Sequence, residues 1–275
     1  MRADLHLHST YSDGLYSPDY LCKLAKERGL TLLSITDHDT LSGEETKKEA
    51  AKRHNLAYLS GWEISAYEGL NKIHILGYGC EKGKAYEAFL EARKQASYLR
   101  AEESVKKFNA LGIPVSMSDV ESMRKDPASP IHTMHIARAA ALYLPMKEGE
   151  VYAAYLNIGK PANCNFGRPS PKQAIDCIHA LGGVACVAHP GRIYMAGNGR
   201  EELLKELADY GVDGIEGVYS SHTEEETEYF CALAKKWGLF VSGGSDTHIE
   251  DGEHTLGQPV YHAGEDLLKR VKIST

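Results

Sequence analysis

Two histidines stand close to the start of the chain, in the run Asp4-Leu5-His6-Leu7-His8. The alternation of polar and apolar residues predicts a strand, whose period of two puts His6 and His8 on one face. Two imidazoles at a strand end can chelate one metal ion, and Asp13 on the following loop adds a carboxylate. Zn²⁺ and Mn²⁺ accept this mixed set of nitrogen and oxygen ligands. An edge strand with solvated histidines is the alternative.

Acidic and imidazole side chains recur near the ends of the apolar runs along the rest of the chain. They are Asp37 and His38, Glu63, His74, His189, and Asp246 and His248. Taken singly, each has an ordinary explanation, such as a helix cap or a buried histidine. The carboxyl ends of parallel strands, however, gather at one rim of an α/β fold. The joint pattern therefore favours a metal cluster at that rim.

Short apolar runs alternate with helical patterns through most of the chain. Ser17-Pro18 predicts a helix start with Ser17 as the N-cap. Strands are predicted at 30–36, 56–60, 72–78, 184–188, 214–218 and 239–242, and further helices at 44–54, 170–181, 200–210 and 224–237. Strands separated by helices predict an α/β fold with a largely parallel sheet.

The middle of the chain has a different pattern. Residues 85–165 carry charged helical periodicity with little strand signal. We expect one barrel domain formed by residues 1–84 and 166–275, and a mainly helical insertion at 85–165 that caps the site.

Composition narrows the class of protein. The chain has 275 residues, a net charge of −7 and six cysteines without a Cys-x-x-Cys spacing. The net negative charge argues against binding to duplex DNA, although bound metal ions would still allow a phosphorylated substrate. We find neither a signal peptide nor an apolar run long enough for a membrane span. These features predict a cytoplasmic protein with reduced thiols.

Six motifs together resemble those of the PHP (polymerase and histidinol phosphatase) superfamily. In chain order they are DLHLHSTYSDG, ITDHDT, GWEIS, IHILGY, VAHPGR and GGSDTH. The resemblance implies a distorted (β/α)₇ barrel with a trinuclear metal site at its rim. The length and the insertion look like the stand-alone nucleotide phosphoesterases, which include 3′,5′-bisphosphonucleoside phosphatases and 5′–3′ exoribonucleases of short RNA. Histidinol phosphate phosphatases and polymerase-associated domains resemble the chain less.

The resemblance also implies a ligand set for three divalent metal ions, with Mn²⁺ preferred and Zn²⁺ or Fe²⁺ as alternatives. The first ion would be held by His6, His8, Glu63 and Asp246, the second by Glu63, His74 and His189, and the third by Asp13, His38 and His248. Asp37 is expected to orient an imidazole, and Asp4 to have a structural or orienting role.

Four residues outside this set are candidate substrate contacts. The guanidinium of Arg192 could donate two hydrogen bonds to a phosphate, and His222 follows another strand end. The resemblance implies His135 and Lys160, although Thr133-Met134 replaces the Arg-Pro that precedes the histidine in the subgroup.

The chemistry expected of such a site is phosphoester hydrolysis by a metal-bridging hydroxide that attacks in line. The preferred substrate is a small nucleotide such as adenosine 3′,5′-bisphosphate. Short single-stranded RNA, cut by a 5′–3′ exoribonuclease, is one alternative, and histidinol phosphate is another. A non-catalytic metal-binding module is the alternative outside the enzymes.

Overall fold

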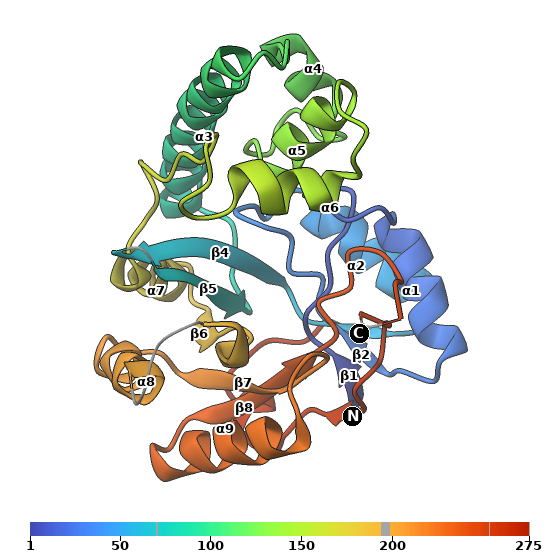
Figure 1. The fold of residues 1–275 in the computed structure, drawn as a ribbon. Helices are drawn as coiled ribbons and strands as arrows, with labels where there is room; N and C mark the ends of the chain where they lie inside the picture. The colour runs from blue at the N-terminus through green and yellow to red at the C-terminus, as the bar shows by residue number, and fades with distance from the viewer. Residues whose placement is uncertain (70, 194–198, 253, 275) are drawn as a thin grey trace.

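The strands of this α/β fold form two sheets (Figure 1). The structure is a computed structural model, and it describes residues 1–69, 71–193, 199–252 and 254–274. One sheet has the order β3-β2-β1-β9, with β1 Arg2–Asp4, β2 Leu32–Leu33, β3 Ala57–Tyr58 and β9 Tyr261–His262. The other has the order β4-β5-β6-β7-β8, with β4 Gly61–Glu68, β5 Asn71–Tyr78, β6 Val184–Val187, β7 Gly214–Tyr219 and β8 Phe240–Gly244.

Isolated backbone contacts link the edges of the two sheets. Leu7 forms a parallel bridge with Thr247 beyond β8, and His38 forms one with Glu63 on β4. The backbone N–H of Leu5 also donates to the carbonyl of Gly243, at 3.1 Å. The α/β class is confirmed, whereas the described strands do not pair as one continuous barrel. The closed (β/α)₇ barrel therefore stays a prediction.

The expectation of a largely parallel sheet is wrong for β5, which runs antiparallel to both β4 and β6. Only two residues separate β4 from β5, too few for the crossover that parallel strands need. The predicted placement of His74 at a strand end is wrong for the same reason. His74 lies inside β5, paired with Ser65, and its carbonyl accepts the N–H of Ala188 just after β6 at 3.0 Å. The reversed strand thereby brings His74 beside His189.

The predicted helices form close to their expected bounds. The Ser17 side chain caps α1 by accepting from the backbone N–H of Tyr20 at 3.3 Å. The helices outside the insertion are α1 Pro18–Glu27, α2 Glu44–Arg53, α7 Pro171–Ala180, α8 Gly199–Asp209, α9 Glu224–Lys236 and α10 Glu265–Leu268. Among the described helices, none is both long and apolar enough to cross a membrane. All six cysteines are free thiols, and the cytoplasmic location stays a prediction.

The insertion forms a group of helices at one end of the molecule (Figure 1). Its elements are α3 Lys84–Ala110, α4 Met117–Ser122, α5 Thr133–Ala141, α6 Glu148–Val151 and a π-helical turn at Tyr152–Leu156. Near its start, α3 packs Tyr86 into the core under β4 and β5. Further along, Ala101 and Phe108 pack with α5 in a separate apolar core. One helix thus serves both cores. The exact division at residues 85 and 165 stays a prediction.

A fully buried lysine joins α2 to the segment after β2. Lys47 Nζ lies 2.8 Å from Asp37 Oδ2 and 3.1 Å from Glu44 Oε1. Burial would raise the pKa of Asp37, but the ammonium of Lys47 holds it below its usual value. Asp37 in turn accepts hydrogen bonds from the Ser9 N–H and the Ser12 hydroxyl, both at 2.7 Å. The lysine therefore supports the loop that carries Asp13.

We expect Lys47→Met to lower the free energy of unfolding by about 3–5 kcal/mol, because it leaves buried carboxylates without their cation. Urea denaturation of the purified variant measures this change. Lys48→Met is the matched control, since Lys48 lies on the same helix and pairs at the surface with Glu45. This control should stay within about 0.5 kcal/mol of wild type. Equal effects of the two substitutions would contradict the role given to Lys47.

Candidate metal centre

The carboxylate of Glu63 is fully buried and surrounded by imidazoles. Glu63 comes from β4, and its neighbours come from β5 and from segments that follow other strands. The nitrogen–oxygen distances are 3.3 Å for His6, 3.2 Å for His8, 2.9 Å for His38, 2.6 Å for His74 and 3.0 Å for His189. The two oxygens of one side chain are thus shared among the whole group.

Three overlapping groups of side chains bring their ligand atoms within 4.8 Å of one another. The groups are His6, His8, Glu63 and Asp246; His38, Glu63 and His74; and His8, Asp13, His38 and His248. His189 lies beside the second group, with its Nε2 atom 3.2 Å from His74 Nδ1. The structure therefore brings together all nine residues of the expected ligand set. Beyond that expectation, His8 and His38 each belong to two groups.

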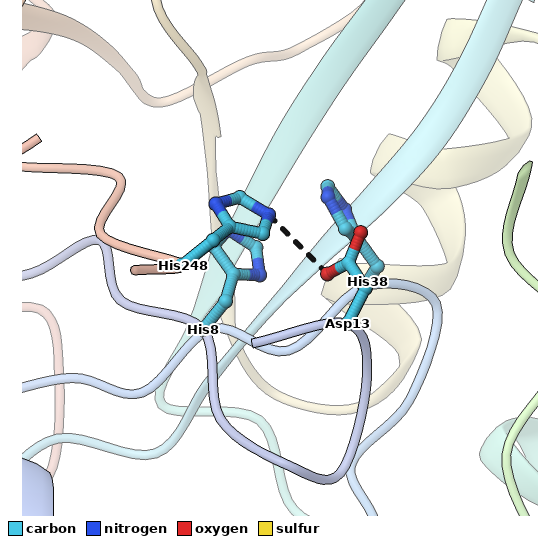
Figure 2. Close-up of side chains that lie close together, drawn as sticks. All are labelled: His8, Asp13, His38 and His248. Carbon is cyan, nitrogen blue, oxygen red and sulfur yellow. Dashed lines mark ion pairs between the residues drawn. The ribbon is translucent and has the colours of Figure 1, made fainter. Parts of the chain in front are cut away.

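Figure 2 shows the group His8, Asp13, His38 and His248, whose side chains point toward one another from separate segments. His248 Nε2 lies 3.2 Å from Asp13 Oδ1, and the His8 and His248 rings stack with centroids 3.9 Å apart. Asp13 comes from the loop before α1, and His248 from the loop after β8. This group forms only when both ends of the chain are in place.

Several buried atoms of the cluster have no hydrogen-bond partner among the described residues. They are His6 Nε2, His8 Nε2, Asp13 Oδ1, His38 Nδ1, Glu63 Oε2 and Asp246 Oδ1. Burying polar atoms without partners is costly. Divalent cations shared among these atoms would satisfy them, and the mixed set of nitrogen and oxygen ligands suits Mn²⁺, Zn²⁺ or Fe²⁺. The residues present therefore fit a polynuclear metal site.

The charges in the cluster stabilise one another. Burial would raise the pKa of Glu63, but nearby histidines, His74 foremost, hold it well below its usual range. Asp246 behaves in the same way, with His6 as its main cationic neighbour. The acidic side chains of the cluster are thus ionised at neutral pH, as metal ligands must be.

Glu216 on β7 is a fully buried residue that the sequence analysis did not single out. Its Oε1 atom lies 2.9 Å from His6 Nδ1, and its Oε2 accepts the backbone N–H of His189 at 2.6 Å. A carboxylate in this position fixes the ring of His6 with Nε2 turned toward Glu63. The signal in the sequence was a charged residue inside the apolar run 214–218.

Two side chains of the cluster sit on unusual backbone. His189 has φ +29° and Asp246 has φ +54°, values that residues other than glycine seldom adopt. The N–H of Asp246 donates to the carbonyl of His6 at 2.8 Å, which fixes that backbone against the extension of β1. Local strain of this kind is common where side chains must converge.

A cavity of about 710 Å³ opens over the cluster, between the sheets and the insertion. Asp13, His38, His74, His189 and Asp246 lie on its wall, together with insertion residues such as Met134, Tyr152 and Ile158. Of the four candidate substrate contacts, Arg192 lines this cavity. Its Nη1 atom donates to the Tyr219 hydroxyl at 2.9 Å, and the side chain is half exposed.

The other three candidates do not line the cavity. Lys160 is exposed on the insertion. His135 is buried behind the wall, where its Nδ1 accepts the backbone N–H of His132 at 3.1 Å. His222 Nε2 accepts the N–H of Gly191 at 3.1 Å, and its Nδ1 donates to the Gly217 carbonyl at 3.1 Å, so the ring links the loop that carries Arg192 to β7.

Three further side chains line the cavity: His132, Lys72 and Arg168. His132 Nε2 is buried and has no hydrogen-bond partner among the residues described. The resemblance pointed instead to His135, three positions later; His132 is the N-cap residue of α5, whereas His135 lies within that helix.

The sequence of the chain is similar to those of two bacterial enzymes. A family model described as "PHP domain" matches residues 4–137. A 5′-3′ exoribonuclease of Haemophilus influenzae is 32% identical over 93% of this chain and 93% of its own length. A 3′,5′-nucleoside bisphosphate phosphatase of Chromobacterium violaceum is 33% identical, over 96% of this chain and 92% of its own.

A solved structure has the same overall arrangement. It is described as an amidohydrolase from Chromobacterium violaceum with bound sulfate and no metal. Its chain is 30% identical and superposes with a TM-score of 0.86, covering 98% of this chain and 97% of that one. The likeness thus extends over both the sheets and the insertion.

We expect Glu216→Gln to weaken Mn²⁺ binding by about 10- to 100-fold, because the amide cannot hold the His6 ring as a carboxylate does. Calorimetric titration of metal into the chelator-treated protein measures this directly. Glu226→Gln serves as the control, since Glu226 is partly exposed on α9 and its carboxylate bonds the N-cap of that helix. Unchanged metal affinity in Glu216→Gln would show that the carboxylate does not orient the site.

Proposed function

The chain belongs to the PHP family, and from that premise we propose that it is a metal-dependent phosphatase of small nucleotides. The proposed substrates are 3′,5′-bisphosphonucleosides such as adenosine 3′,5′-bisphosphate. One observation carries the proposal: the shared carboxylate of Glu63 and its ring of histidines lie beneath a cavity whose wall also carries cationic side chains. Carboxylates and imidazoles would hold metal ions, while the cations would hold phosphate.

Divalent metal ions bound in the cluster would supply an activated water and neutralise charge on the phosphoryl oxygens. We propose that three ions bind and that the preferred metal is Mn²⁺. The residues of the chain do the positioning. Glu63, Asp246 and Asp13 supply ionised oxygens. All nine members of the ligand set keep the metal-holding role that the sequence analysis gave them.

Arg192 is the proposed contact to the phosphate that is cleaved. The Tyr219 hydroxyl holds its guanidinium near Asp246, with Arg192 Nη1 3.7 Å from Asp246 Oδ2. A planar guanidinium can bond two phosphoryl oxygens at once. His132 replaces His135 in the proposal, because its buried Nε2 lies at the cavity wall and can hydrogen-bond the substrate.

A 5′–3′ exoribonuclease of short RNA is the second candidate. It is supported by the Haemophilus relative, which is as similar to this chain as the phosphatase is. The cavity favours the mononucleotide, because residues of the insertion such as Met134, Tyr152 and Ile158 stand over the cluster. A strand of RNA would need a continuous groove past these side chains.

We expect the Mn²⁺-loaded protein to release phosphate from adenosine 3′,5′-bisphosphate faster than from 5′-AMP or histidinol phosphate. His8→Ala should lower kcat/KM at least about 100-fold, because it removes a side chain shared by two of the groups. A phosphate-release assay measures both effects. His262→Ala is the control, since His262 lies exposed on β9 and should keep full activity.

A 5′-phosphorylated oligoribonucleotide is run in parallel on a gel. Stepwise shortening of the RNA, without release from the bisphosphate, would replace the phosphatase with the exoribonuclease. Metal-loaded protein that is silent on all four compounds would refute the phosphoesterase.

A further inference from the structure

The segment Gly167-Arg168-Pro169, where the chain leaves the insertion, is held on both sides of Arg168. Arg93 Nη1 donates to the Gly167 carbonyl at 2.9 Å, and the Tyr67 N–H donates to the Pro169 carbonyl at 2.9 Å. Gly167 has φ +66°, and a Cβ there would lie 2.9 Å from Ala96 Cβ. The backbone of Arg168 is thus fixed without any help from its own side chain.

The surroundings of this segment carry more positive than negative charge. Arg93 pairs with Asp39, at 2.8 Å between Nη2 and Oδ2. Arg100 is also buried, and it donates to the carbonyls of Phe166 and Gly167. Burial, together with repulsion from Arg168 and Arg93, lowers the pKa of Arg100 to about 9. Such a group of guanidiniums around one carboxylate would be stabilised by a further anion.

The side chain of Arg168 is the member of this group that lines the cavity. Its guanidinium carbon lies 5.0 Å from the centroid of the Tyr67 ring, a stacking contact that fixes its plane. Its Nη2 atom has one long hydrogen bond, 3.5 Å to the Thr133 hydroxyl. Its Nε atom is buried and has no hydrogen-bond partner among the described residues. The N–H donors of Arg168 are therefore held in place but make few hydrogen bonds within the protein.

Lys72 adds a second cation to the same wall of the cavity. In the β4–β5 hairpin Lys72 pairs with Tyr67, the residue under the Arg168 guanidinium, and His74 pairs with Ser65. Along β5, therefore, Lys72 stands two residues from His74, a rise of about 7 Å. The cationic pair lies near the turn of the hairpin, and the metal cluster lies two residues further along the same strand.

We propose that Arg168, assisted by Lys72, binds a second anionic group of the substrate, the phosphate that is not hydrolysed. This inference rests on the proposed function and deepens it, because it makes Arg168 the residue that selects nucleotides with two phosphates over those with one. A purely structural role fits Arg168 poorly, since Arg93, Arg100 and Tyr67 already hold its loop.

The first test compares adenosine 3′,5′-bisphosphate with adenosine 3′-monophosphate, which lacks only the 5′-phosphate. In the Mn²⁺-loaded protein, Arg168→Met should lower kcat/KM for the bisphosphate by about 10- to 100-fold through KM. Its kcat/KM for the monophosphate should change less than about 3-fold. Arg168→Lys should recover part of the loss, because it restores the charge without the planar fork.

The control is Lys106→Met, which removes one positive charge from an exposed position on α3 and should leave both substrates unaffected. An equal loss on both substrates, or no loss on either, would overturn the assignment of Arg168. Because Arg168→Lys keeps the cation in place, the same comparison remains decisive if Arg168→Met folds poorly.

A second measurement separates this inference from the proposed function. Calorimetry on the chelator-treated protein measures the affinity of the two nucleotides without turnover. Wild type should bind the bisphosphate more tightly, and Arg168→Met should bind both equally. If this preference is present but the metal-loaded protein does not hydrolyse the bisphosphate, the anion site stands and the proposed function fails. If wild type binds the two nucleotides equally, the anion site is refuted.

Discussion

The arrangement of this molecule depends on one buried carboxylate. Glu63 has no exposed surface, and five imidazoles approach its two oxygens. An ionised group in such a place needs opposite charge around it, or it becomes neutral. The segments after β1, β2 and β6 and the strand β5 supply these rings, and the carboxylate of Glu216 holds the ring of His6. The requirement to surround Glu63 therefore explains why polar side chains crowd the interior of an otherwise apolar fold.

The packing between the sheets follows from the same requirement. A Cβ at Gly244 would lie 2.4 Å from the Cβ of His6, so only glycine lets β8 approach the segment after β1 that carries the histidines. The glycine pair before Ser245-Asp246 is thus needed for close contact between the two sheets. On the other side of the site, Lys47 and Asp37 hold the loop of Asp13 with buried charge. Apolar packing alone would not fix this polar loop.

Sequence could predict the parts of the site that follow from local pattern. Most of the nine expected ligand residues stand in or shortly after a short apolar strand, and such strands are readable one at a time; Asp13 lies on the loop before α1. The orientation of β5 was missed because no strand was predicted at 61–68, where β4 forms only two residues before β5. Residues whose roles depend on distant partners were missed as well. Glu216, for example, is recognisable only beside His6. His132 and His135 differ in the direction of their side chains, which no periodicity gives.

The residues of the cluster are drawn from positions 6 to 248 of the chain, and β1 has β9 as one neighbour and β2 as the other. Bringing such distant segments together costs chain entropy and belongs to the late steps of folding. A metal site that includes Asp246 or His248 cannot act as an early nucleus made of a few local residues. During synthesis, β2 soon follows the first two histidines, but β9 and the loop of His248 are added only when almost all of the chain has been made. Metal ions that use these late residues as ligands would therefore bind to a fold that has already formed, and loading with metal would follow folding.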